Sequence, residues 1–139
     1  MKNILIVEDD IQTARLLQLL MEREGFDVIT RYHGVDAMRF LEVNTPDLIL
    51  MDIQLPGYDG FEILHWLRVK KKREMVPVIL VTAYRSTYKR RLADELGATD
   101  LIFMPFKVQD LVARVHAAMN TAVFPLPIPS SRSFMALNR

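Results

Sequence analysis

Residues 47–62 of this 139-residue chain read DLILMDIQLPGYDGFE. The stretch includes four consecutive apolar residues, 48–51, which have the length and pattern of a strand covered on both faces of a sheet. Asp52 follows this run directly, and the Pro-Gly pair at positions 56 and 57 indicates a loop. Because Asp52 lies between a buried strand and a loop, it has no obvious capping role and is a candidate site residue.

Four further apolar runs of similar length occur along the chain, at residues 4–7, 26–29, 78–81 and 101–104. Only the run at 26–29 contains a charged residue, so the other strands are expected to be covered on both faces. The segments between the runs carry apolar residues at helical spacing, as at Ile11, Ala14 and Leu17. Helices are therefore predicted near residues 11–24, 34–44, 60–71, 86–96 and 107–119, and Gly25 and Gly97 suit the ends of the first and fourth.

Five strands that alternate with five helices predict an α/β fold with helices on both faces of a doubly wound parallel sheet, a three-layer sandwich. Two doubly wound strand orders are common at this size. In the five-stranded order 2-1-3-4-5, the direction in which successive strands are added to the sheet reverses between the first and third strands. Ligands bind outside the carboxyl ends of the strands at this point. The rule points to the residues that follow positions 7 and 51.

Acidic residues occupy both of these strand ends. Glu8, Asp9 and Asp10 follow the first strand, and Asp52 follows the third. Converging carboxylates repel one another unless they are protonated or bridged by a cation, and oxygen ligands without nearby histidine or cysteine favour Mg²⁺. The alternative is that the residues at 8–10 only cap the first helix, where acidic side chains suit the helix dipole. Asp52 favours the metal site.

A carboxylate beside Mg²⁺ can act as a nucleophile toward a phosphoryl group and form an aspartyl phosphate. Asp52 is the candidate nucleophile. Thr82, at the end of the fourth strand, can donate a hydrogen bond to a phosphoryl oxygen, and the small Ala83 follows it. The alternative is that Thr82 is an ordinary β-branched residue at a strand end.

The segments at residues 4–10, 47–62 and 77–83 together resemble the receiver domain of two-component response regulators. The resemblance covers residues 1–120 and implies a flavodoxin-like fold with Asp52 phosphorylated by a sensor histidine kinase or a phosphotransfer protein. It implies a phosphoacceptor that assists its own phosphorylation and dephosphorylation and signals to a downstream protein or effector domain, and not a conventional enzyme. The implied Mg²⁺ ligands are Glu8, Asp9, Asp52 and the backbone carbonyl of Gln54, with Thr82 and Ala83 next to the phosphoryl group.

Two positions depart from the family pattern. Receivers normally carry a lysine directly before the Pro-Phe pair at 105 and 106, and this chain has Met104 there. Three residues earlier, where an aromatic switch residue is common, the chain has Leu101. Lys107 and Arg85 are candidates for a compensating cation, although Lys107 is expected to face elsewhere and Arg85 to be a solvated loop residue.

Three hypotheses of function follow from this pattern. The first is a phosphorylation-dependent receiver with an altered switch, which the intact Glu8, Asp9, Asp52 and Thr82 favour. The second is a pseudo-receiver, a protein-interaction module that signals without stable phosphorylation, which Met104 favours. The third, a Mg²⁺-dependent hydrolase with an aspartyl nucleophile, lacks any recognisable acid/base residue or substrate cap.

The charge of the chain is segregated. Residues 68–91 contain nine basic residues and one acidic residue, a local charge of +8, while the remainder of the chain carries −7. This segment is either a solvated face or a docking surface for an acidic partner. Within it, the candidate output surface consists of Arg85, Lys89, Arg90 and Arg91. A homodimer is an open alternative, and nucleic acid is expected only as an indirect partner because no reader module fits in this length.

The ends of the chain carry little further signal. The sequence has no cysteine and no apolar run long enough for a signal peptide or a membrane span, so we expect no membrane partner and a cytoplasmic location. Three prolines alternate with apolar residues in 124–129, a pattern that excludes helix. We therefore expect a receiver domain at residues 1–120 and a proline-containing tail or linker at 121–139.

Overall fold

The structure is a computed structural model that describes residues 1–71, 76–83 and 85–123. Its five strands are all parallel and form one sheet in the order β2-β1-β3-β4-β5, which confirms the predicted topology. They are β1 (Asn3–Val7), β2 (Asp27–Arg31), β3 (Leu48–Asp52), β4 (Val78–Thr82) and β5 (Asp100–Phe103). Strand β5 ends one residue earlier than predicted, so Met104 lies just beyond it.

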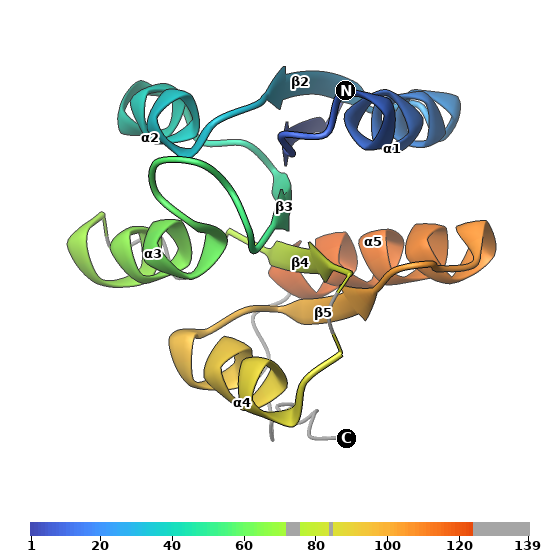
Figure 1. The fold of residues 1–139 in the computed structure, drawn as a ribbon. Coiled ribbons are helices and arrows are strands. Elements are labelled where there is room, and N and C mark those ends of the chain that lie inside the picture. Colours follow the sequence, from blue (N-terminus) through green and yellow to red (C-terminus); the bar gives the residue numbers. More distant parts are fainter. Residues whose placement is uncertain (72–75, 84, 124–139) are drawn as a thin grey trace.

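Helices cover both faces of this sheet (Figure 1). On one face lie α2 (Gly34–Val43), α3 (Gly60–His65) and α4 (Thr87–Leu96), and on the other lie α1 (Ile11–Arg23) and α5 (Val108–Val123). Each face has its own apolar core, because successive strand residues point to opposite sides. Leu41 and Leu64 belong to the first core, and Leu17 and Leu111 belong to the second. The three-layer sandwich is therefore as predicted.

The strand register places the predicted site residues at one edge of the sheet. Val7 pairs with Met51, so the residues that follow β1 lie beside the end of β3. Asp52 in turn pairs with Val81, and Thr82 pairs with Phe103. Because all strands are parallel, their carboxyl ends meet at this edge.

Two local predictions were wrong. The apolar spacing placed Ile11 on one helix face with Ala14 and Leu17, but Ile11 is the first residue of α1 and is 54% exposed. The third helix was expected to be regular over 60–71, but α3 ends at His65 and continues as a π-helical turn, η1 (Trp66–Lys70). In this turn Leu67 stays buried, and Arg68 donates hydrogen bonds to the carbonyls of Val76 (2.6 Å) and Gly97 (3.0 Å). Arg68 is therefore bound to the fold and not merely solvated.

The last helix continues to Val123, past the position at which we expected the domain to end. From residue 124 onward the predicted proline-containing tail lies outside the described residues. No helix in the described part of the chain combines the length and the apolar character that crossing a bilayer requires.

Candidate functional site

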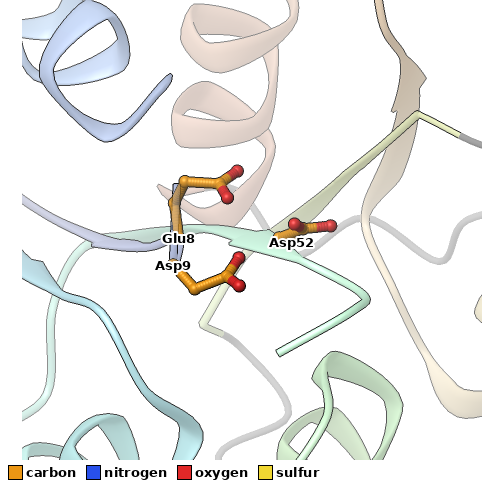
Figure 2. A group of neighbouring side chains, drawn as sticks. All are labelled: Glu8, Asp9 and Asp52. Carbon is orange, nitrogen blue, oxygen red and sulfur yellow. The ribbon is translucent and has the colours of Figure 1, made fainter. Parts of the chain in front are cut away.

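Three carboxyl groups converge where β1 and β3 end (Figure 2). One oxygen of each of Glu8, Asp9 and Asp52 lies within 4.8 Å of one oxygen of each of the other two. Glu8 is buried with 4% of its surface exposed, Asp52 is half-buried and Asp9 is exposed. The cluster is thus open to solvent on one side and enclosed on the other, as a site that takes up an ion requires.

The local sequence separates the acidic residues at 8–10 into two roles. Asp10 is the N-cap of α1, and its carboxylate accepts hydrogen bonds from the backbone N–H of Thr13 (2.9 Å) and from the Thr13 hydroxyl (2.6 Å). These bonds lower the pKa of Asp10. Glu8 and Asp9 instead join Asp52, so the capping alternative holds for Asp10 alone.

Burial controls the protonation of the cluster. The pKa of Glu8 is raised to about 8, first by loss of solvent and then by the neighbouring Asp52 and Asp9, while a hydrogen bond from the Asp10 N–H opposes the shift. Burial also raises the pKa of Asp52, although the N–H of Gln54 donates to Asp52 Oδ1 at 3.2 Å and opposes the shift. Near neutral pH, Glu8 therefore holds a proton in the metal-free protein. A divalent cation would replace that proton, and three carboxylates suit a hard cation such as Mg²⁺.

The loop after Asp52 is packed tightly against the helix that follows it. Gly60 begins α3, and its N–H donates to the carbonyl of Ile53 at 2.8 Å. A Cβ at this position would lie 2.5 Å from the backbone oxygen of Asp52. Only glycine allows this approach, so Gly60 helps to place the Asp52 loop. The sequence contains this residue within 47–62, but the need for it is visible only in three dimensions.

Thr82 directly follows Val81, the residue of β4 that pairs with Asp52 on β3. It is 1% exposed, lies at the end of β4, and its backbone carbonyl accepts a hydrogen bond from the N–H of Met104 (2.8 Å). Ala83 follows it and is exposed. The backbone N–H of Gln54 faces Asp52, and the role of the Gln54 carbonyl as a ligand stays a prediction.

The two atypical positions supply neither a charge nor an aromatic ring. Met104 is half-buried directly after β5, and Leu101 is buried in the core between the sheet and α4. Among the described residues, no lysine or arginine forms an ion pair with Glu8, Asp9 or Asp52. The acidic cluster therefore has no cationic partner in this part of the chain.

The basic residues lie along a neighbouring groove of about 460 Å³ between α4, β5 and α5, which Arg85, Arg90 and Lys107 line together with Phe103. The guanidinium groups of Arg85 and Arg90 lie 4.9 and 5.2 Å from the centre of the Phe103 ring. Arg85 is an exposed loop residue, as expected, and it also contacts the Phe103 ring. The sequence reasoning also missed Phe103, an aromatic residue two positions after Leu101 and on the same face of β5.

Comparison with known proteins points to one family. The model of the response regulator receiver domain family matches residues 4–116. A CheY-like receiver domain protein from Methanospirillum hungatei is 28% identical over 88% of this chain and 96% of its own, with a TM-score of 0.82. The signal receiver domain of a signal transduction histidine kinase from Syntrophus aciditrophicus is 31% identical over 92% and 97%, with a TM-score of 0.82.

A third similar structure is the BeF3-activated N-terminal receiver domain of RstA from Klebsiella pneumoniae. It is 30% identical over 85% of this chain and 98% of its own, with a TM-score of 0.79. The family match extends from β1 into α5 and so includes the strand ends that carry Glu8, Asp9, Asp52 and Thr82. The chain belongs to the response regulator receiver domain family of two-component signalling.

Proposed function

We infer that this receiver domain accepts a phosphoryl group on Asp52, in the presence of Mg²⁺, and thereby switches a protein-binding surface. The observation that carries the proposal is the convergence of Glu8, Asp9 and Asp52 within 4.8 Å at the end of β3. Buried carboxylates at this spacing destabilise the site unless a proton or a cation joins them. The raised pKa of Glu8 is the sign of that cost.

Glu8, Asp9, Asp52 and the carbonyl of Gln54 would hold the Mg²⁺. When bound, the ion neutralises charge on the carboxylates and on the incoming phosphoryl oxygens. An oxygen of Asp52 attacks the phosphorus of a phosphohistidine on a sensor histidine kinase or phosphotransfer protein. The O–P bond forms as the P–N bond breaks, and the imidazole nitrogen keeps the electron pair and takes up a proton.

Thr82 and Ala83 would serve the phosphorylated state. The Thr82 hydroxyl would donate a hydrogen bond to a phosphoryl oxygen, and the small side chain of Ala83 leaves room beside it. Because Thr82 pairs with Phe103, a shift of Thr82 would displace β5, the edge strand of the sheet. This step would connect the site with the groove between α4, β5 and α5.

The output surface would be the basic surface at the start of α4. Arg85, Arg90 and Arg91 are exposed at the start of α4, together with the half-buried Lys89, and they favour an acidic downstream protein or effector domain. A homodimer through this surface stays an alternative. We place this signalling in the cytoplasm, as expected from the sequence.

The test is phosphorylation by a small donor. Full-length protein is incubated with Mg²⁺ and acetyl phosphate, and its intact mass is measured. We expect one phosphoryl adduct in the wild type and in the control Asp36→Asn, which changes an exposed carboxylate on α2, and none in Asp52→Asn. An adduct that persists in Asp52→Asn would contradict the proposal.

The second candidate is the pseudo-receiver, and Met104 is the observation that favours it. A pseudo-receiver would show no Asp52-dependent adduct with acetyl phosphate and no binding of beryllofluoride, the species that activates the Klebsiella receiver domain. A Mg²⁺-dependent response of the protein to beryllofluoride that is lost in Asp52→Asn would exclude it.

A further inference from the structure

In the phosphorylated state, the acidic cluster would carry more negative charge than one bound Mg²⁺ neutralises. Phosphorylation of Asp52 places a phosphoryl group with a charge near −2 beside Glu8 and Asp9, and one Mg²⁺ leaves about two negative charges uncompensated. No described lysine or arginine pairs with the three carboxylates. Met104, directly after β5, is a neutral thioether and cannot supply the missing charge.

Three cationic side chains besides Arg85 line the neighbouring groove. Each is less suited than Arg85 to contact a phosphoryl group on Asp52. Arg114 is bound to Asp100 (2.8 Å) and Asp110 (3.2 Å). Arg90 belongs to the body of α4, so its backbone is fixed by the helix. Lys107 lies beyond Pro105, and its carbonyl accepts hydrogen bonds from the first turn of α5, from the N–H of Asp110 and of Leu111.

Arg85 differs from these three residues. It lies in the short loop between Thr82 and the N-cap Ser86, it is exposed, and it has no carboxylate partner among the described residues. Arg85 is three positions after Thr82, a span of at most about 11 Å. The strand of Asp52 is the direct neighbour of the strand of Thr82, about 4.8 Å away. Arg85 therefore starts from the same edge of the sheet as Asp52.

The cation–π contact between Arg85 and Phe103 can be replaced. The Arg85 guanidinium lies 4.9 Å from the centre of the Phe103 ring, and Arg90 covers the same ring at 5.2 Å. The ring thus keeps one cation when Arg85 leaves. A phosphoryl group is the stronger partner, because a guanidinium can donate two parallel charge-assisted hydrogen bonds to it.

We propose that Arg85 is the cation that contacts the phosphoryl group on Asp52. This loop arginine would supply the positive charge that Met104 cannot. The inference rests on the proposed function. It makes Arg85 a two-position residue that lies on Phe103 in the unphosphorylated protein and turns to the phosphoryl group as the O–P bond forms. Leaving Phe103 would also open the groove between α4 and β5, which links phosphorylation to the basic surface.

The experiment measures the initial rate of adduct formation on the full chain with acetyl phosphate and Mg²⁺. We expect Arg85→Met to slow the reaction about tenfold, because a charge-assisted contact to the transferred group is lost. Arg39→Met, which removes an exposed arginine on α2, is the control and should keep the wild-type rate. In the Arg85→Met background, Met104→Lys should restore most of the rate, because it returns a cation at the end of β5.

Several outcomes would overturn the inference while the proposed function stands. One is an Asp52-dependent adduct that forms at the wild-type rate in Arg85→Met. Another is equal slowing in Arg85→Met and Arg90→Met, which would assign the effect to the packing of Phe103. A third is slowing in Lys107→Met with none in Arg85→Met, which would move the role to Lys107. A wild-type protein that forms no adduct would instead contradict the proposed function itself.

Discussion

Glu8 connects the pH of the solution with the occupancy of the site. Its side chain is 4% exposed and lies beside Asp52, and burial raises its pKa to about 8. Because the proton on Glu8 and a cation at the cluster exclude each other, Mg²⁺ binding should release a proton near neutral pH. The affinity for Mg²⁺ should therefore increase as the pH rises toward 8.

The stability of the metal-free protein should depend on pH through the same residue. Between the ordinary Glu8 pKa of 4.5 and its folded value of about 8, the folded protein holds more protons than the unfolded chain. The free energy of unfolding therefore decreases as the pH rises through this range. In Mg²⁺-free buffer, the free energy of unfolding of Glu8→Gln should exceed that of the wild type by about 4 kcal/mol at pH 8 and equal it below pH 4.5, as measured by urea unfolding.

Glu95→Gln is the matched control for this measurement, because Glu95 is exposed on α4. It should follow the wild-type pH profile. Parallel profiles for the wild type and Glu8→Gln would mean that Glu8 ionises freely in the folded protein.

The π-helical turn at Trp66–Lys70 joins three elements that are distant in sequence. Arg68 leaves this turn half-buried and donates to the carbonyl of Val76, just before β4, and to the carbonyl of Gly97, the C-cap of α4. A carbonyl at the C-terminal end of a helix, such as that of Gly97, has no partner within the helix. The turn therefore supports the base of the sheet on the side opposite to the acidic cluster.

Replacing this arginine should cost stability and leave the chemistry unchanged. We expect Arg68→Met to lower the free energy of unfolding by about 1–3 kcal/mol, because two carbonyls lose a charged donor. Lys70→Met, two residues further on and exposed, should change it by less than about 0.5 kcal/mol. Denaturant unfolding measures both variants, and an unchanged adduct yield with acetyl phosphate would confirm that Arg68 acts on the fold alone. Equal stability of the two variants would contradict the role of Arg68.

In the whole molecule, the site exists only when the sheet is formed. Glu8 and Asp52 lie 44 positions apart in the sequence, and the pairing of β1 with β3 brings them together. The unfolded chain keeps no such arrangement, so a cation should bind the folded protein almost exclusively. Binding and folding are therefore coupled.

Removal of the metal should consequently destabilise the protein. At a Mg²⁺ concentration of 100 times its Kd, the free energy of unfolding should exceed that in chelator by about 2.7 kcal/mol. Asp9→Asn should reduce this gain, because it removes one carboxylate of the cluster, while Asp36→Asn should keep it. Thermal unfolding with and without chelator tests both variants, and a full Mg²⁺ gain in Asp9→Asn would exclude Asp9 as a ligand.

Patterns within short stretches of sequence were sufficient to predict most of the fold. Continuous apolar runs predicted the strands, helical spacing predicted the crossovers, and together they predicted a doubly wound parallel sheet. The order 2-1-3-4-5, one of the two common at this size, is the one that the structure shows. The same patterns predicted that Asp52 follows a buried strand. They did not predict the π-helical turn after His65, because its hydrogen bonds to Val76 and Gly97 join residues that no short stretch of sequence contains.

The sequence by itself determined the sheet, the family and the acidic residues of the site, because apolar spacing and strand ends are properties of neighbouring residues. Only the tertiary structure decided which acids share the site: Asp10 turns to cap α1, while Glu8 and Asp9 meet Asp52. It also decided that Arg85 lies on Phe103, two strands away from Asp52. These contacts depend on strand register and on burial, which arise only when distant segments pack together.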